Sequence, residues 1–138
     1  MKNNDGVLVG SFDPFTRGHY DIVSRAARLF TNLYLGVADD TGDKKCVCDA
    51  STRAKIVSVA CRDLPNVHVQ PFNGLLTDFC GKVGAYTVVR GLRTFADFEY
   101  ERSLSAVYKS QCKEIESVFL LSDPSCAHIS GTFVRSLC

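Results

Sequence analysis

Gly10–His19 reads GSFDPFTRGH and joins an apolar run at residues 7–10 to an amphipathic pattern at residues 18–30. A short apolar run that ends in glycine predicts a strand, and apolar residues spaced three and four apart predict one face of a helix. The two glycines of the stretch allow a turn and a close backbone approach to a ligand. A helix that begins there presents free N–H groups and the positive end of its dipole, which suits a phosphate group.

His19 falls in the first turn of this predicted helix, where an imidazole can donate hydrogen bonds to phosphate oxygens. The residues alone leave a second interpretation open, in which Asp13-Pro14 makes a turn and His19 lies on the surface. The stretch is neither a Walker A motif nor a G-x-G-x-x-G fingerprint, so its spacing does not decide between the two.

Strand-like and helix-like patterns alternate along the rest of the chain. Four further strands are predicted at residues 33–38, 67–69, 85–89 and 117–121. Three further helices are predicted at residues 51–64, 75–82 and 96–109. We expect Pro71 to end the third strand, and a last short helix to follow Ile129 with Ser130 as its N-cap. The alternation predicts an α/β fold, with a five-stranded parallel sheet and helices on both faces.

Two of these helices show apolar stripes that should face the sheet. Their members are Ile56, Val57, Ala60, Cys61 and Leu64 in the first, and Tyr100, Leu104 and Tyr108 in the second. Ligands of such sheets bind outside the carboxyl ends of the strands, which points to the segments after Val9, Ala38 and Val89. No repeat or linker interrupts the pattern, so residues 1–138 are expected to form a single domain.

The composition is that of an ordinary globular protein, with 138 residues, 46% hydrophobic and 22% charged. The net charge of +1 argues against a general nucleic-acid binder. No apolar run is long enough to span a membrane, and residues 1–10 lack the apolar stretch of a signal peptide. We therefore expect a cytoplasmic protein that binds neither nucleic acid nor membrane.

The chain contains seven cysteines, an odd number that leaves at least one thiol unpaired within the chain. A metal site on Cys46 and Cys48, with Cys61 or His68, is one interpretation. The C-x-C spacing and the lack of a second pair argue against it. We therefore interpret these cysteines as small apolar residues and expect no metal ligands among them.

Two further groups of residues suit phosphate chemistry. Arg90 and Arg93 flank a glycine at a predicted strand end, and guanidinium groups are favoured partners of phosphates. They could equally be surface arginines that pair with Asp97 and Glu101. The polar stretch at residues 39–45 contains lysines that could neutralise a phosphate, or that could simply be solvated.

The GSFDPFTRGH stretch resembles the T-x-G-H signature of the phosphopantetheine adenylyltransferase family, within the H-x-G-H nucleotidyltransferase superfamily. The runs RGLR at residues 90–93 and DFEYE at residues 97–101 match the family's pattern at every position. The resemblance extends from Val7 to Arg135. It implies a Rossmann-like nucleotidyltransferase fold, and adenylyl transfer from ATP to 4′-phosphopantetheine that gives dephospho-coenzyme A and pyrophosphate in coenzyme A biosynthesis.

The resemblance also implies roles for individual residues. The catalytic residues would be His19, Lys44 and Arg93. The residues that bind 4′-phosphopantetheine would be Ser11, Lys44, Leu76 and Arg90. The residues that bind ATP would be Ser11, Phe12, His19, Gly91, Leu92, Arg93, Glu101, Cys126, Ala127, His128, Ile129, Ser130, Gly131 and Thr132. Lys45 is the alternative to Lys44, because the loop carries one extra residue.

The sequence departs from the family in a few places. Ser11 replaces the usual threonine and keeps the hydroxyl, while Gly131 replaces a serine and loses one. Relatives also continue further beyond the position of Cys138, in additional helix, and we expect activity without that part.

The implied reaction is an in-line displacement, in which the anionic phosphate of 4′-phosphopantetheine attacks the α-phosphorus of ATP without a general base. Mg²⁺ is implied as the partner of the triphosphate, and a homohexamer as the assembly. Three other functions stay open: a cytidylyltransferase for a sugar or glycerol phosphate, a non-catalytic nucleotide-binding module, and a thiol-based sensor. The RGLR and DFEYE runs argue against the first. Nothing singles out a reactive thiol for the third.

Overall fold

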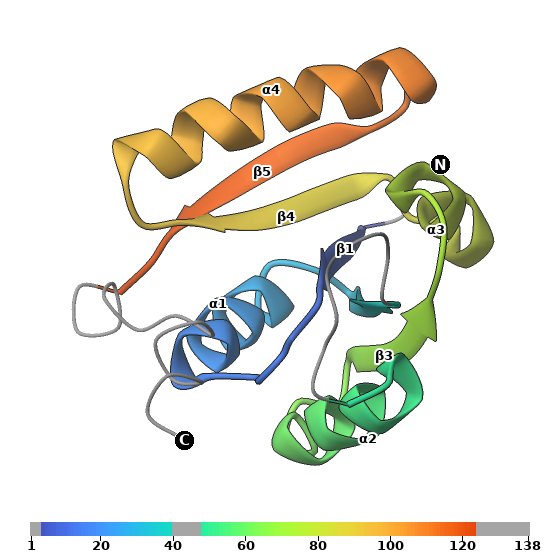
Figure 1. Ribbon diagram of the computed structural model, residues 1–138, viewed down its shortest axis with the longest axis vertical. Coiled ribbons are helices and arrows are strands. Elements are labelled where there is room, and N and C mark those ends of the chain that lie inside the picture. Colours follow the sequence, from blue (N-terminus) through green and yellow to red (C-terminus); the bar gives the residue numbers. More distant parts are fainter. Residues whose placement is uncertain (1–3, 40–47, 124–138) are drawn as a thin grey trace.

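The computed structural model describes residues 4–39 and 48–123, which form one parallel sheet covered by helices (Figure 1). The strands are β1 (Asp5–Gly10), β2 (Asn32–Ala38), β3 (Val67–Phe72), β4 (Thr87–Leu92) and β5 (Glu116–Leu121). The helices are α1 (Arg17–Ala27), α2 (Ala50–Ala60), α3 (Leu76–Val83) and α4 (Phe95–Gln111). All strand pairs are parallel, in the order β3-β2-β1-β4-β5.

The helices lie on both faces of the sheet, as the sequence predicted. One core cluster joins α1 and α2 to the sheet through residues such as Val23, Leu35 and Val57, all fully buried. The second joins α3 to the opposite face through Cys80 and Val88, and Tyr108 of α4 packs against it. Alternate residues of one strand pack into the two clusters, because successive side chains of a strand point to opposite faces of the sheet.

The order of the strands places the functional segments side by side. The chain passes from β1 through β2 to β3 in one direction, and β4 and β5 lie on the other side of β1. A doubly wound sheet has its ligand crevice at such a reversal, beyond the carboxyl ends of the two strands. Here those ends are Gly10 of β1 and Leu92 of β4. The GSFDPFTRGH and RGLR stretches therefore meet at the carboxyl ends of these two neighbouring strands.

Two strand predictions were wrong in their bounds. Pro71 does not end β3, which continues to Phe72 with Pro71 in register with Val37. Since β3 is an edge strand, it can accommodate a residue that lacks a backbone N–H. Strand β4 does not end at Val89 but continues through Leu92, so most of the RGLR run lies within a strand.

The predicted stripes of two helices were partly wrong. Helix α2 buries Ala50, Arg53, Ala54 and Val57, while Ile56 is 51% exposed. Its inward face is therefore rotated from the predicted one and contains a charged residue. In α4, Tyr100 is 64% exposed and its neighbour Glu101 is buried. The predicted last helix, with its cap at Ser130, lies outside the described residues.

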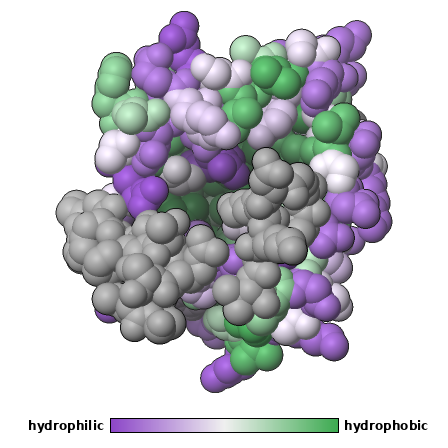
Figure 2. Space-filling model, in the orientation of Figure 1, coloured by the Kyte–Doolittle hydropathy of each residue, from purple (hydrophilic) through white to green (hydrophobic). Residues whose placement is uncertain are grey.

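Helix α4 and the edge strand β5 leave much apolar surface exposed. Phe95 is 78% exposed and Leu121 is 73% exposed. Figure 2 shows hydrophobic and hydrophilic side chains intermixed over this part of the molecule. Among the helices that the structure describes, none is long and apolar enough to cross a membrane.

Candidate active site

The GSFDPFTRGH stretch at residues 10–19, here called the signature turn, ends in a helix cap that fixes His19. Thr16 is the N-cap of α1, and its hydroxyl accepts a hydrogen bond from the His19 backbone N–H at 3.3 Å. In return, the Thr16 backbone N–H donates to Nδ1 of the His19 ring at 3.0 Å. Together these contacts form a capping box in which histidine occupies the position usually held by glutamate or glutamine. Because Nδ1 accepts a hydrogen bond, the proton of the neutral imidazole lies on Nε2.

Two phenylalanine rings enclose the His19 imidazole. Phe15 is stacked on it with a centroid distance of 5.6 Å, and Phe12 meets it edge-on at 5.3 Å. Burial, and after it the positive charges of Arg93 and Arg90, lower the pKa of His19 from 6.5 to about 4. His19 is therefore a neutral hydrogen-bond donor near pH 7, beside two permanent positive charges.

The backbone of the turn is constrained at Phe12, which has a φ of 50°. This left-handed conformation is uncommon for a residue with a large side chain, and such residues cluster at functional sites. The Phe12 ring is buried and packs edge-on against Phe15 at 5.5 Å. Its backbone is therefore the part of Phe12 left to bind a ligand. The enclosure of His19 by Phe15 was not predicted, although the F-x-x-F spacing was visible in the sequence.

Arg90 is held by a buried carboxylate. Its Nε and Nη2 donate to the two carboxylate oxygens of Glu101, each at 2.9 Å, and its Nη1 donates to the Val9 carbonyl at 2.8 Å. The Glu101 side chain is 8% exposed and that of Arg90 is 27% exposed. This bidentate pair links β4, β1 and α4. The pairing left open by the sequence thus occurs, and it occurs at the site rather than on a remote surface.

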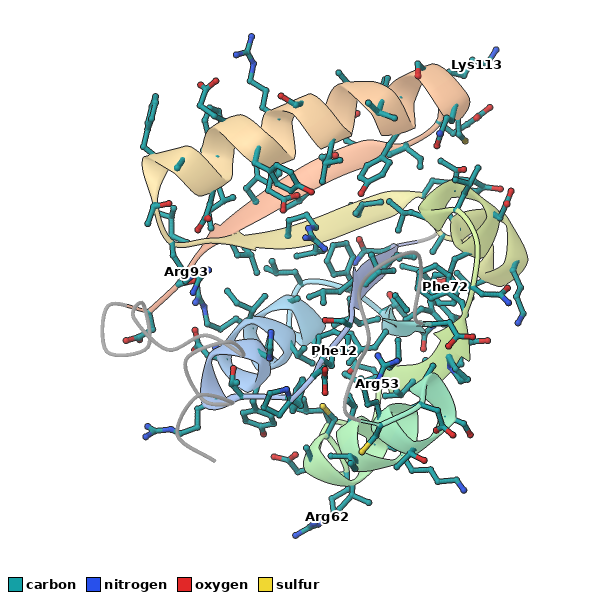
Figure 3. The ribbon with its side chains drawn as sticks, viewed as in Figure 1. Phe12, Arg53, Arg62, Phe72, Arg93 and Lys113 are labelled. Carbon is teal, nitrogen blue, oxygen red and sulfur yellow. The ribbon has the colours of Figure 1, made fainter. Side chains whose placement is uncertain are left out.

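Arg93 has a looser partner. Its Nε lies 3.6 Å from Asp97 Oδ2, and its side chain is 40% exposed. Asp97 accepts hydrogen bonds from the backbone N–H groups of Arg93 and Thr94, at 3.0 and 3.2 Å, and so completes the capping box of α4, whose N-cap is Thr94. Figure 3 shows Arg93 pointing from the end of β4 toward α1. Its guanidinium group is thus more exposed than that of Arg90.

Gly91 and Leu92, which were predicted to bind ATP, also take part in packing within the protein. A Cβ atom on Gly91 would lie 3.0 Å from Ile22 Cγ1, so glycine allows α1 to approach β4 closely. Leu92 is buried. Any contact of Leu92 with a ligand would therefore have to come mainly from its backbone.

Leu76 begins α3 and is buried in the same cluster as Phe79 and Cys80. Next to this helix lies a cavity of about 400 Å³. It is lined by Asp39, Pro71, Phe72, Asn73, Asp78, Phe79 and Lys82. The cavity therefore lies beyond the carboxyl ends of β2 and β3.

Similarity to known proteins agrees with this geometry. A family model described as cytidylyltransferase-like matches residues 7–137. Two proteins named phosphopantetheine adenylyltransferase, from Staphylococcus carnosus (strain TM300) and Staphylococcus saprophyticus subsp. saprophyticus, are 36% and 37% identical to the chain over 137 residues. The matches cover 99% of this chain and 84% of each relative. The chain belongs to the phosphopantetheine adenylyltransferase family.

The fold of this family member has relatives among solved structures. A bifunctional NMN adenylyltransferase/ADP ribose pyrophosphatase from Francisella tularensis has a TM-score of 0.72 at 15% identity, over 99% of this chain and 42% of that one. At this identity the likeness supports the fold, which is the Rossmann-like nucleotidyltransferase fold predicted above.

Some residues that the family resemblance nominated belong to the undescribed part of the chain. Lys44, Lys45 and residues 126–132 lie outside the described residues. Ser11, Phe12, His19, Arg90, Arg93 and Glu101 are described, and they lie on or next to the signature turn and the end of β4.

The sequence did not predict a site role for Arg53, which is 2% exposed and lies beneath the signature turn of this family member. Its guanidinium group donates to the Ser11 carbonyl, and Figure 3 shows Arg53 next to Phe12. The sequence offered one indication of such a role. Arg53 lies three residues after Ala50 and four before Val57, a spacing that places it on the inward face of α2.

The cysteines do not form a metal site within the described part of the chain, where no group of three potential ligands is found. Cys61 and Cys80 are buried in the two core clusters, as the interpretation as small apolar residues predicted. Burial raises the pKa of each thiol to about 11. Both therefore remain protonated and are poor metal ligands and nucleophiles near pH 7. Cys46 of the proposed C-x-C pair lies outside the described residues.

Proposed function

We propose that this chain transfers the adenylyl group of ATP to 4′-phosphopantetheine, forming dephospho-coenzyme A and pyrophosphate in coenzyme A biosynthesis. One observation carries the proposal: a neutral imidazole, with its donor fixed by Thr16, lies beside Arg90 and Arg93 at the carboxyl edge of the sheet. Membership of a family whose curated relatives carry the name phosphopantetheine adenylyltransferase supports the choice of substrates.

In the proposed reaction, a phosphate oxygen of 4′-phosphopantetheine forms a bond to the α-phosphorus of ATP, and the bond from that phosphorus to the bridging oxygen of pyrophosphate breaks. The attacking oxygen is already anionic near pH 7, so the protein need not remove a proton. The protein's contribution is to position the two substrates and to stabilise charge on the phosphoryl group in transit. A preorganised donor suits this purpose, since it needs no rearrangement during the reaction.

His19 is proposed to donate its Nε2–H to a non-bridging oxygen of the α-phosphate. The Thr16 N–H and the two phenylalanine rings hold the imidazole in the tautomer and orientation that this contact requires. Arg93, with its partly exposed guanidinium group, is proposed to neutralise negative charge on the same group. Lys44 is proposed as a further cation from outside the described residues.

Arg90 is proposed to hold the phosphate of 4′-phosphopantetheine together with the Ser11 hydroxyl. Its guanidinium group is directed by Glu101 and by the Val9 carbonyl, so its position is fixed before substrate binds. Glu101 was expected to contact the nucleotide. Both of its carboxylate oxygens accept from Arg90, so we propose that it acts chiefly by orienting Arg90.

Magnesium is proposed to enter with ATP as part of the substrate. The described residues contain no group of three potential metal ligands, and two carboxylates of the DFEYE run, Glu101 and Asp97, are engaged by arginine and by a helix cap. Cationic side chains and a neutral imidazole fit phosphate oxygens better than a divalent cation. The remaining ligands of the ion would be triphosphate oxygens and water.

A cytoplasmic homohexamer is proposed as the working form. The exposed apolar residues on α4 and β5, among them Phe95 and Leu121, support self-association of this face. The molar mass in solution, measured by light scattering during size-exclusion chromatography, tests the assembly. A single species at the mass of one chain would contradict it.

The experiment for the proposed function follows pyrophosphate release by purified protein given ATP, magnesium and 4′-phosphopantetheine. We expect release that requires 4′-phosphopantetheine and that His19→Ala reduces by about 100-fold or more, because a main transition-state donor is lost. His68→Ala is the matched control, since His68 pairs with Asn32 on β2, remote from the signature turn. No release despite ATP binding would favour the binding module, and a preference for CTP would favour the cytidylyltransferase.

A further inference from the structure

We propose that Arg53 is a positioning residue for the transfer reaction, because it fixes the orientation of the Ser11–Phe12 peptide in the signature turn. The inference rests on the proposed function and adds a residue to which neither the family resemblance nor the comparisons assign a role. Its side chain comes from α2.

Arg53 joins three segments that are far apart in the sequence. Its Nη1 donates to the carbonyls of Ser11, at 2.5 Å, and Ala38, at 2.9 Å. Its Nε donates to the Cys48 carbonyl at 2.8 Å. These carbonyls lie after β1, at the end of β2 and just before α2. A planar guanidinium group with donors in a fixed geometry can meet three such acceptors at once, whereas an ammonium group on a flexible stem cannot fix them in the same way.

The contact with Ser11 has a direct consequence for Phe12. The carbonyl of Ser11 and the N–H of Phe12 belong to one peptide unit, which is trans. In a planar trans peptide the two groups point in opposite directions. Directing the carbonyl toward the buried guanidinium group therefore directs the Phe12 N–H away from Arg53. Since the Phe12 ring is buried, this N–H is the polar group of Phe12 that a nucleotide phosphate could meet.

The same contact restrains the uncommon backbone conformation at Phe12, where φ is 50°. Such a conformation persists when the surrounding structure holds it on both sides. On the carboxyl side, Thr16 and His19 form the capping box. On the amino side, the fixed point is the Ser11 carbonyl on Arg53. Loss of Arg53 should therefore loosen the turn at one end and displace the backbone donor relative to His19.

Burial of a guanidinium group is unfavourable unless hydrogen bonds compensate for the lost water. Arg53 is 2% exposed and lies among Ala50, Ala54 and Val57 on the inward face of α2, where an apolar side chain would fill the space. An apolar residue could not, however, direct the carbonyls of Ser11, Ala38 and Cys48. We infer that the orientation of these carbonyls, rather than packing, is the reason for arginine at this position.

The test compares Arg53→Lys and Arg53→Met with a matched control, Asn66→Ala. Asn66 also donates to two carbonyls, those of Ala27 at 2.7 Å and Phe30 at 3.1 Å, but it does so directly before β3, at the amino ends of the strands. The Tm, and kcat and KM for both substrates, are measured for each variant. We expect kcat to fall about 10- to 100-fold in the Arg53 variants, because small displacements of reacting groups have large effects on rate. KM should change less, and Asn66→Ala should keep the wild-type kcat.

A kcat in the Arg53 variants no lower than in Asn66→Ala, at a comparable loss of Tm, would overturn the inference and leave Arg53 a structural residue only. If Arg53→Met does not fold, Arg53→Lys still decides, since it keeps the positive charge and one donor group. Lysine that restored full kcat would also contradict a requirement for the planar fork.

The wild-type assay separates failure of this inference from failure of the proposed function. No pyrophosphate release by the wild type would contradict the function, and the inference would then be decided by the backbone amide NMR signals of residues 11–19. We expect Arg53→Lys to shift or broaden the signals of Phe12 and His19, and Asn66→Ala to leave them in place. Unchanged signals in Arg53→Lys would overturn the inference in that case too.

Discussion

The signature turn and the start of α4 both carry family motifs, yet they place their functional groups in different ways. In the turn, the polar atoms of Thr16 and His19 bond to each other, and the proton of the neutral imidazole lies on Nε2. At β4 and α4, positive groups are held by carboxylates, with Arg90 on Glu101 and Arg93 near Asp97. The first region fixes a neutral donor by local hydrogen bonds, whereas the second fixes cations by charge pairing across elements.

This difference separates two kinds of motif residue. His19, Arg90 and Arg93 are the motif residues that we propose to contact the substrates. Asp97 and Glu101 are engaged by other parts of the protein. A motif that matches a family at every position therefore need not consist only of ligand contacts, and substitutions should distinguish the two kinds.

Among the substitutions that test this difference between the two regions, Glu101→Gln is expected to have the largest effect on stability and substrate binding. The amide can accept from only one of the two Arg90 donors and carries no charge, so the variant should lose about 2 kcal/mol of unfolding free energy. Arg90 would also lose its fixed direction, and KM for 4′-phosphopantetheine should rise about 10-fold. Urea unfolding and steady-state kinetics measure the two effects.

Glu99→Gln provides the control for this change. Glu99 Oε2 lies 3.9 Å from Arg102 Nη1 on an exposed part of α4, and exposed ion pairs contribute little to the free energy of unfolding. An equal loss of stability in the two variants would mean that the pair of Arg90 and Glu101 is no more than another surface ion pair.

A smaller effect, on the pKa of His19, is expected from Phe15→Ala. The stacked ring contributes to the burial that lowers this pKa from 6.5 to about 4, so its removal should raise the pKa toward 6.5. NMR titration of the imidazole measures the change. Phe98→Ala, on α4, is the control and should leave the pKa of His19 where it is. A titration in Phe15→Ala identical to that of the wild type would show that the ring does not shield His19.

The sign of the accompanying pH effect on stability follows from the lowered pKa. His19 contributes stability that is present above about pH 6.5 and is lost as the pH falls to about 4. Over this range the unfolded chain binds the proton more readily than the folded one. In Phe15→Ala, with a pKa nearer 6.5, this loss of unfolding free energy between the two pH values should be smaller.

The smallest effect is expected from Thr94→Ala, which removes the N-cap hydroxyl of α4. Loss of a cap costs about 1 kcal/mol of unfolding free energy. The Asp97 side chain still accepts from the Arg93 backbone, so kcat should stay within about two-fold of the wild-type value. Thr77→Ala is the control for urea unfolding, because Thr77 donates to Gln111 over a longer 3.4 Å. A large drop in kcat for Thr94→Ala would assign the cap a part in the reaction.

The fold was predictable because local periodicity determines it. Apolar runs and amphipathic stripes located every strand and helix of the described residues, and their alternation gave the parallel sheet. The errors arose where tertiary context decided the outcome. Pro71 is tolerated because β3 is at the edge of the sheet, a position that the chain alone does not reveal.

The site was predictable only in part, for a related reason. Motifs nominated His19, Arg90 and Arg93 as site residues, since their neighbours in the sequence carry the family pattern. The stacking of Phe15 on His19 and the contact of Arg53 with Ser11 depend on how the turn folds back and where α2 packs. Arg53 and Ser11 are 42 positions apart, and no local pattern relates them.

The central claim is that His19 is a neutral donor fixed through its Nδ1 atom, and ¹⁵N NMR of the imidazole in the wild-type protein tests it most directly. We predict the Nε2–H tautomer at pH 7 and no protonation until the pH approaches about 4. A ring that titrates near 6.5, or that carries its proton on Nδ1, would contradict the account.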